Sequence, residues 1–254
     1  AKASDFLQEL AGKVDCIYLD PARRDEQGSK VFKLQDCSPN VVELKQQLLA
    51  RAGQILIKAA PLLDIQSAIR DLEQVSRVWV VSVKNECKEV LYLLEPGDPQ
   101  DPLISTVNLL DEGMQQFDFK FSEEADAVAE YSVPQAFLYE PNASLLKAGA
   151  FQQVAITYDL AKLHPNSHLY TSDHLRADFP GRVFQLVAQS KYHRKALRAL
   201  VPDGKANMSV RNFPESVQQI RKKTGIRDGG DLYIFATTIM PRQRSLLICR
   251  RVSV

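Results

Sequence analysis

Short apolar runs alternate with amphipathic stretches over the first hundred residues. The strand-like runs cover residues 16–20, 54–61, 77–86 and 88–96, and the helix-like stretches cover 40–53 and 62–75. Asn40 marks the start of the first helix after Ser38 and Pro39, Gly53 is expected to end it, and Asp64 lies near the start of the second. This alternation predicts an α/β fold with a parallel sheet and crossover helices.

The last two of these strands leave almost no room for a helix between them. They are therefore expected to form a hairpin, which would place an antiparallel strand at the sheet edge. The segment 95–102, "EPGDPQDP", has the composition of a loop, and 103–110 forms a further strand that could return to the same sheet.

A change of pattern at 123–135 suggests a domain boundary. Residues 139–173 contain two short helical stretches followed by loop and strand. From 182 onward the pattern predicts a compact β-α-β-α-β-β module. Its expected strands are 183–189, 205–211, 231–238 and 244–252, and its expected helices are 192–200 and 214–224.

The charge is distributed unevenly along the chain. Residues 182–254 contain 15 Lys and Arg against 4 Asp and Glu, a net charge of +11, whereas residues 1–181 contain 17 against 27. A basic module of this size indicates a polyanionic partner, most plausibly nucleic acid, and the alternative is that it docks on the acidic part of the same chain.

Composition also limits the class of protein. No run of about 18 apolar residues is present and the first residues lack a secretory signal pattern, so we expect a soluble, cytoplasmic protein with no membrane association. The four cysteines include no C-x-x-C pair, which favours reduced core thiols, with Cys16 and Cys249 in apolar runs. His164 and His168 have the spacing of a metal pair, but Pro165 interrupts the helical period, so no metal site is predicted.

The first strand ends in an unusual way, in the segment "VDCIYLDPARRD" at residues 14–25. Asp20 comes at the carboxyl end of the strand, where ligands bind in open parallel sheets, and Pro21 restricts its backbone. We therefore expect Asp20 to act as a hydrogen-bond acceptor or general base. Arg23 and Arg24 would contact phosphate or orient the substrate loop, although Arg24 could equally pair with an acidic neighbour such as Asp25.

Several longer segments resemble one family. They are "YLDPARRD...KVFKLQDCSPNVVEL", "LIKAAPLLDI", "WVVSVKNECKEVLYLLEP", "LYEPNASLLKAGAF", "KLHPNSHLYTS" and "ANMSVRNFPESVQQIRKKTGIRDGGDLYIFAT". Over nearly its whole length the chain resembles bacterial S-adenosylmethionine-dependent methyltransferases that carry a carboxy-terminal THUMP-like domain.

The resemblance implies three parts: the carboxy-terminal half of a Rossmann-like methyltransferase sheet at 1–118, a small ferredoxin-like module at 119–181, and an α/β THUMP-like domain at 182–254. It implies methylation of structured RNA such as rRNA or tRNA, with the THUMP-like domain binding the RNA. The alternatives are an RNA-binding protein on a degenerate methyltransferase scaffold and methylation of a substrate other than RNA.

Two departures from the family pattern matter. No glycine-rich G-x-G-x-G turn follows a strand, so we expect the chain to be a fragment whose S-adenosylmethionine site lies mainly upstream and which is inactive alone. Arg23 stands where base N-methylating relatives usually carry an aromatic residue. Asp-Pro-x-Arg resembles the 5-methyluridine enzymes, but the position of their cysteine nucleophile is occupied here by the segment at Lys58, and Cys87 lies a strand later.

The candidate site residues form two sets. The catalytic set is Asp20, Pro21 and Arg23. The substrate-binding set is Arg24, Lys58, Lys191, Arg194, Lys195, Arg198, Arg221, Lys222 and Lys223. Two alternatives apply: Lys58 could extend from a buried strand to water, and the cations near the end of 214–224 could offset the helix dipole. Ser82, Asn85 and Glu86 are second-rank candidates for the same cleft as Lys58.

Overall fold

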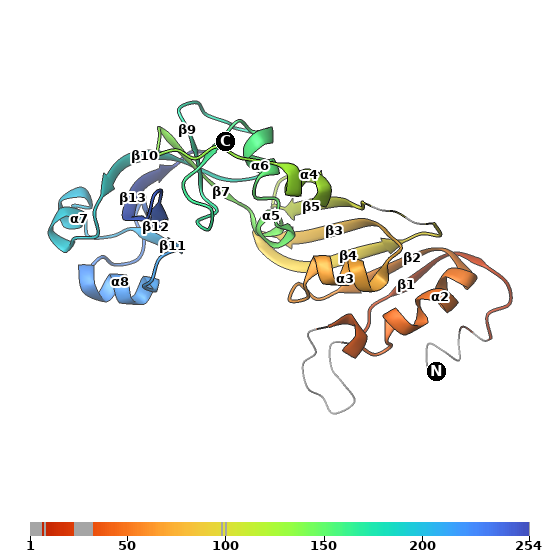
Figure 1. Cartoon of the computed structure of the whole chain (residues 1–254). Helices are drawn as coiled ribbons and strands as arrows, with labels where there is room; N and C mark the ends of the chain where they lie inside the picture. The colour runs from red at the N-terminus through yellow and green to blue at the C-terminus, as the bar shows by residue number, and fades with distance from the viewer. Residues whose placement is uncertain (1–6, 8, 23–32, 98, 100, 254) are drawn as a thin grey trace. The chain divides into compact units, whose positions relative to one another are not determined.

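The computed structural model describes residues 7, 9–22, 33–97, 99 and 101–253. It divides the chain into two compact units (Figure 1). The first unit comprises Ala1–Ala125 with Ala143–Gly149, and the second comprises Asp126–Asn142 with Ala150–Val254. Arg23 and Arg24 lie outside the described residues.

The first unit is built on a six-stranded mixed sheet with the order β1-β2-β4-β3-β5-β6. β1 runs parallel to β2 and β3 parallel to β5, while β4 is antiparallel to both of its neighbours, as β6 is to β5. The strands are β1 (Val14–Leu19), β2 (Ala52–Ala59), β3 (Val75–Val83), β4 (Glu86–Leu94), β5 (Leu103–Leu109) and β6 (Met114–Lys120).

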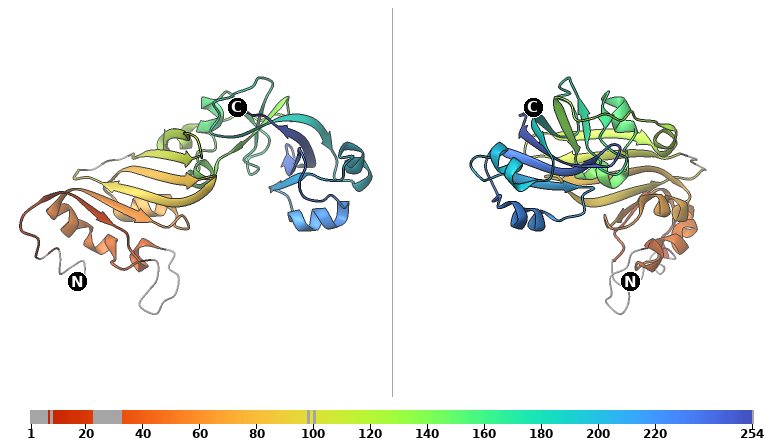
Figure 2. Two further views of the ribbon diagram at one scale, coloured as in Figure 1. Left: turned by 180° about the vertical axis from the view of Figure 1, so that it is seen from behind. Right: turned by 60° about the vertical axis from the view of Figure 1, so that its left-hand side comes forward.

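Helices cover this sheet. They are η1 (Leu34–Asp36), α2 (Val41–Arg51), α3 (Ile65–Leu72), α4 (Phe121–Asp126) and α5 (Ala143–Ala148), of which α2 and α3 lie on one face (Figures 1 and 2). The Asn40 side chain accepts a hydrogen bond from Val42 N at 3.1 Å, and Asp64 accepts one from Ser67 N at 2.7 Å. Both amino ends are therefore capped, as the sequence predicted.

The expected hairpin is present, but the prediction that its antiparallel strand lies at the sheet edge is wrong. β4 is inserted between β2 and β3, and Val90, Tyr92 and Leu94 are fully buried there. An apolar side-chain row of this kind is stabilised by neighbours on both edges, which an outer position would not supply.

Two smaller expectations also differ from the structure. Gly53 does not end a helix, since α2 ends at Arg51 and Ala52 already pairs with Val14 in the parallel ladder of β1 and β2. Cys16 is exposed rather than in the core, because β1 is the outer strand of its sheet, whereas Cys249 is buried.

The second unit contains a seven-stranded sheet with the order β11-β12-β13-β10-β7-β9-β8. Among the described strands of this sheet, β11 and β12 are the pair that runs in parallel. The strands are β7 (Phe137–Pro141), β8 (Ala161–Lys162), β9 (Tyr170–Ser172), β10 (Gly181–Ser190), β11 (Asn207–Arg211), β12 (Leu232–Ile239) and β13 (Gln243–Arg251), and the helices are α6 (Gln153–Thr157), α7 (Arg194–Leu200) and α8 (Val217–Thr224).

Two apolar clusters stabilise this sheet. One joins Leu197 of α7 and Ile220 of α8 to Ile234 and Ile248 of the strands, so both helices cover one face. The other contains Phe184 and Phe235 with Leu138, Leu163 and Leu169. β7 and β10 pair directly, from Gly181 opposite Pro141 to Gln185 opposite Phe137, so a single sheet continues through both halves of the unit.

The loop 163–169 between β8 and β9 holds one perturbed histidine. The ring of His168 stacks on Phe151 with 3.8 Å between centroids. Burial, followed by the charges of Lys162 and Arg211, lowers the pKa of His168 to about 4. His168 is therefore neutral near pH 7 in the folded protein.

No helix in the described ranges is long and apolar enough to cross a membrane.

Gly181→Ala should destabilise the second unit by about 3 kcal/mol or more, because an added Cβ would lie 2.2 Å from the Glu140 carbonyl oxygen and 2.6 Å from the Phe179 ring. Gly204→Ala is the control: its Cβ meets nothing within 4 Å and only its positive φ of 62° adds a cost, of about 1 kcal/mol. Urea unfolding measures both, and equal losses would contradict the steric argument.

Protonation of His168 should destabilise the second unit in acid. Since the folded pKa is about 4 against 6.5 for the ordinary side chain, the stabilising contribution is present above pH 6.5 and decreases as pH falls toward 4. The slope should be at most about 1.4 kcal/mol per pH unit. His168→Asn should flatten it in urea titrations between pH 7 and 4.5, whereas exposed His174→Asn is the matched control; an unchanged slope in His168→Asn would refute this assignment.

Candidate active site and basic surface

The carboxyl ends of β1 and β2 bring two of the predicted site residues together. Leu19 pairs with Ile57 in the parallel ladder, so the next residues, Asp20 and Lys58, are neighbours. Lys58 Nζ lies 2.5 Å from Asp20 Oδ2, and Glu89 of β4 lies 3.8 Å from the same ammonium. The inserted position of β4 supplies this second carboxylate.

The ion pair has a clear electrostatic effect on the lysine. Its hydrogen bond to Asp20 raises the pKa of Lys58 above the ordinary 10.5, and desolvation opposes this only in part. Lys58 is therefore a cation at neutral pH and holds the Asp20 carboxylate in place. About 46% of the Asp20 side chain stays exposed, so the remaining acceptor positions of the carboxylate can reach an N–H or O–H group of a substrate.

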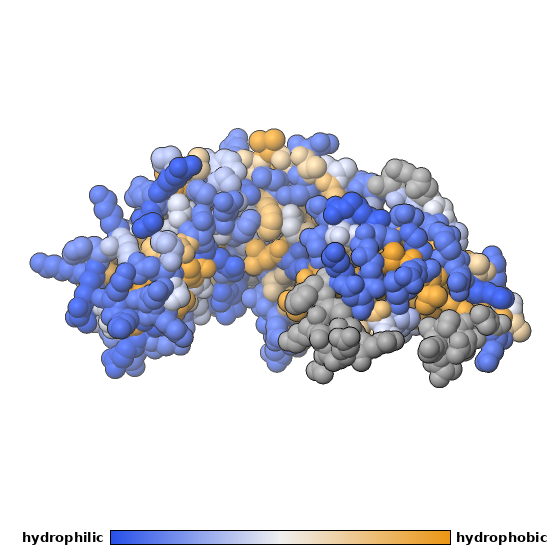
Figure 3. All heavy atoms as spheres, turned by 60° about the horizontal axis from the view of Figure 1, so that its bottom comes forward, coloured by the Kyte–Doolittle hydropathy of each residue, from blue (hydrophilic) through white to orange (hydrophobic). Residues whose placement is uncertain are grey.

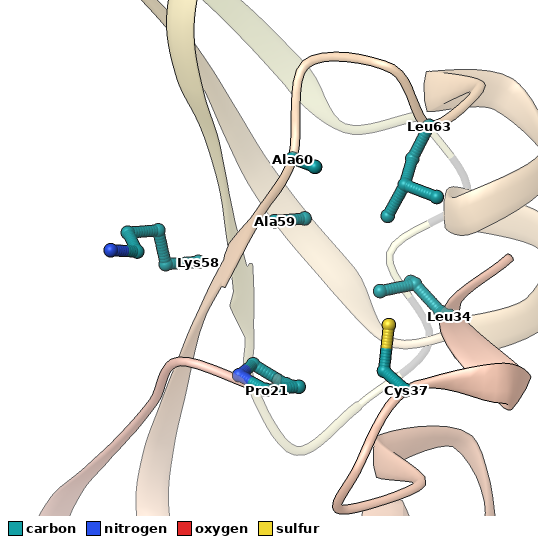
Figure 4. A pocket seen from close by; sticks show the side chains of 7 residues that line it. All are labelled: Pro21, Leu34, Cys37, Lys58, Ala59, Ala60 and Leu63. Carbon is teal, nitrogen blue, oxygen red and sulfur yellow. The ribbon is translucent and has the colours of Figure 1, made fainter. Parts of the chain in front are cut away.

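The two faces of the sheet at the end of β2 differ in character. A small cavity of about 10 Å³ is lined by Pro21, Leu34, Cys37, Lys58, Ala59, Ala60 and Leu63, and Figure 4 shows the ammonium end of Lys58 pointing away from the other six. A cavity of this size holds about one water molecule, so it is no nucleobase site. Pro21 therefore contributes to the packing beneath the site, while Asp20 and Lys58 face the polar side.

Ala22 and Ser38 close the loop that follows Asp20. Ala22 N donates to Ser38 O at 2.7 Å, and Ser38 N donates to Ala22 O at 3.3 Å. The predicted contributions of Arg23 and Arg24 fall inside this loop and outside the described residues, so they stay predictions.

Two of the second-rank candidates, Asn85 and Glu86, have structural contacts. Asn85 lies in the β3–β4 turn with φ of 64°, and its Oδ1 accepts a hydrogen bond from Ala143 N at 2.8 Å, at the start of α5. Ser82 is buried in β3, and Glu86 pairs with Lys88 at 2.7 Å. Burial raises the pKa of the Cys87 thiol, which disfavours the thiolate that a nucleophile needs.

Part of the predicted basic surface is engaged in internal contacts. Arg198 Nε donates to Thr224 O at 3.2 Å and so joins α7 to the end of α8. Arg221 donates to Ala206 O at 3.2 Å and pairs with Asp228 at 2.5 Å. Lys223 pairs with Glu215 at 2.8 Å.

Four other members are exposed and do not take part in the contacts described above. Lys191, Arg194, Lys195 and Lys222 are exposed on or beside α7 and α8. The surface over these helices is mostly hydrophilic (Figure 3). We call these four residues the open basic set, and they are the better candidates for contacts with a polyanion.

The sequence did not single out one group in the second unit. Glu140 of β7 is buried, and it accepts hydrogen bonds from Arg182 Nε at 2.8 Å and from Arg211 Nη2 at 2.9 Å. The signal was a glutamate within the apolar run "AFLYEP", which requires a cationic partner if the run is a buried strand. Glu89 was also missed, since its place beside Lys58 depends on the position of β4.

The described residues offer few ligands for a metal ion. No group of three or more His, Cys, Asp or Glu side chains within the described ranges could hold a metal ion. His164 Nδ1 instead accepts from Asn166 N at 3.1 Å. The Asn40 side chain accepts hydrogen bonds from two backbone amides at the start of α2, and Asp64 accepts one at the start of α3. The expectation that the S-adenosylmethionine site lies mainly upstream stays a prediction.

Comparisons with known proteins agree with this architecture. Residues 137–180 match the model of a ferredoxin-like domain, and residues 181–251 match a THUMP domain-like model. A crystal structure from Porphyromonas gingivalis W83, of a protein provisionally named a methyltransferase, is 36% identical with a TM-score of 0.87. No curated protein matches the chain.

The match with that structure covers 94% of this chain and 60% of the other protein. The expected fold class, a methyltransferase-type sheet followed by ferredoxin-like and THUMP-like parts, is confirmed. The chain is therefore similar over nearly its whole length to a bacterial protein provisionally named a methyltransferase, and its last part matches a THUMP-like domain.

Proposed function

We propose that the protein of which this chain forms part is an S-adenosylmethionine-dependent methyltransferase that acts on structured RNA. The observation that carries this proposal is the Asp20–Lys58 pair at the carboxyl ends of two parallel strands, the place where ligands bind in open α/β sheets. The similarity to a protein provisionally named a methyltransferase supports the reaction class, and the THUMP-like domain supports an RNA substrate.

Asp20 would act on the target group. Its exposed carboxylate accepts a hydrogen bond from the N–H or O–H that is to be methylated and takes up the proton released from it. Lys58 orients the carboxylate through the 2.5 Å contact and balances its charge before the substrate arrives. S-adenosylmethionine supplies the methyl group when it is bound. In this proposal, most of the residues that bind it lie outside the described part of the chain.

The outer strand β1 supports this division of the site. None of its six residues is buried, and β2 is its one partner in the described sheet. A strand edge of this kind has free backbone donors and acceptors along its length. We propose that the cofactor-binding half of the methyltransferase domain completes the sheet along β1, and that 1–118, 119–181 and 182–254 serve as partial catalytic, connecting and RNA-binding parts.

Asp20→Asn in the full-length protein should lower the rate of methyl transfer by about 10²-fold or more, because the amide keeps the size of the side chain but loses its proton-accepting capacity. Tritium transfer from labelled S-adenosylmethionine to total RNA measures the rate, and calorimetry should show unchanged cofactor affinity. Asp15→Asn, an exposed carboxylate on β1, is the matched control. Wild-type turnover by Asp20→Asn would remove Asp20 from the reaction.

Reversing charge in the open basic set should weaken RNA binding. Arg194→Glu with Lys195→Glu should lower affinity and decrease the slope of log K against log salt by about 0.7 to 0.9 for each lost phosphate contact. Fluorescence anisotropy with a labelled transfer RNA transcript measures both quantities, with Arg70→Glu plus Lys84→Glu in the first unit as the control.

An unchanged slope would place the RNA-binding surface elsewhere. If the wild-type protein has no salt-dependent RNA affinity, methylation of a different kind of substrate is favoured. RNA binding by a full-length protein that transfers no methyl group would favour an RNA-binding protein on an inactive scaffold.

A further inference from the structure

Glu140 and Lys162 are the only charged side chains that are buried among the residues that the structure describes. An ionised carboxylate without partners in such a place is strongly unfavourable. Glu140 has two arginine partners, Arg182 from the adjacent strand β10 and Arg211 from the end of β11. One cation would satisfy the charge, so the second leaves a net positive charge at this point.

The geometry fixes both guanidinium groups. Arg182 donates to Glu140 Oε2 through Nε and Nη2, and Arg211 donates to Oε1 through the same two atoms at 3.2 and 2.9 Å. These contacts leave the Nη1 groups unused by Glu140. Each arginine side chain is also 32% exposed, whereas the Glu140 side chain is 3% exposed, so both arginines are partly open to solvent while the carboxylate that holds them is buried.

Among the described residues, Glu140 is the one carboxylate in the ion pairs of these two arginines. Arg211 and Lys162 act together on His168, which stacks on Phe151, and both lower its pKa. The guanidinium of Arg182 also lies 5.6 Å from the centre of the Phe184 ring, which restricts it further. A fixed, positively charged pair of planar donors matches the oxygen atoms of a phosphate group.

We propose that Arg182 and Arg211, held by Glu140, form a phosphate-binding site for the backbone of RNA. Glu140 lies in the segment that matches the ferredoxin-like model and both arginines lie in the THUMP-like one, so the site requires the two parts together. Its assignment to RNA rests on the function proposed above, whereas its chemistry, the binding of a phosphate group, does not. Neither arginine belongs to the open basic set on α7 and α8.

The test compares Arg182→Gln plus Arg211→Gln with a control of equal charge loss, Arg227→Gln plus Arg242→Gln, whose arginines are exposed in the same unit. Anisotropy with a short labelled RNA should show about tenfold weaker binding for the first pair, with a slope of log K against log salt smaller by about 0.7 to 0.9. The control pair should retain most of the wild-type affinity.

Inorganic pyrophosphate provides the second arm. Phosphorus NMR of pyrophosphate should show line broadening with the wild-type protein and little with Arg182→Gln plus Arg211→Gln. Loss of broadening without any RNA binding by the wild type would support a free-phosphate site and overturn the RNA assignment. Wild-type RNA affinity and broadening in this variant would overturn the site, even if the protein methylates RNA.

A folding failure is covered by Arg182→Lys plus Arg211→Lys. These lysines keep both charges beside Glu140, but an ammonium group cannot form the paired Nε and Nη2 contacts that orient a guanidinium. The lysine variant should unfold near the wild-type temperature and bind the RNA several-fold more weakly. Wild-type affinity in a folded lysine variant would contradict the requirement for oriented guanidinium groups.

Discussion

The insertion of β4 between β2 and β3 is the constraint on which the first unit depends. A hairpin strand that returns beside its own partner would ordinarily lie outside the sheet, but here its buried side chains, Val90, Tyr92 and Leu94, require neighbours on both edges. As a result the two parallel strands β2 and β3 are separated by an antiparallel one. This arrangement also brings Glu89 to the carboxyl end of β2, beside Lys58.

The polar group at this end combines one cation with two carboxylates. The Lys58 ammonium lies 2.5 Å from the Asp20 carboxylate and 3.8 Å from the Glu89 carboxylate, so it interacts mainly with Asp20. If Asp20 is the proton acceptor of the proposed reaction, its pairing with a cation fixes its position before it meets a substrate, which reduces the reorganisation needed during reaction. Apolar side chains around the small cavity lie on the other face of β2 and pack beneath this turn, so the polar side chains lie on one face only.

Much of this arrangement could be predicted from the sequence because it depends on local patterns. Asn40 and Asp64 begin helices, the strands from 182 onward lie within a few residues of their predicted bounds, and the Asp20 motif marks a strand end.

The errors concern partners that are distant along the chain. The sequence predicts a helix end at Gly53, which is wrong because the pairing of Ala52 with Val14 is not visible locally. The place of β4 depends on which strand edges remain free. The partners of Glu140 were missed for the same reason, since Arg211 is 71 positions away.

The continuous sheet of the second unit affects how its two halves can change. β7 of the ferredoxin-like segment and β10 of the THUMP-like segment are joined by a ladder of five residue pairs. One end of this ladder is the pair of Pro141 and Gly181. Truncation at that boundary would leave an unpaired strand edge on each side. It would also leave the buried Glu140 carboxylate without either arginine. Exchange of one half between related proteins would have to preserve both the ladder and the residues around this carboxylate, so the two segments form one structural unit although they match separate domain models.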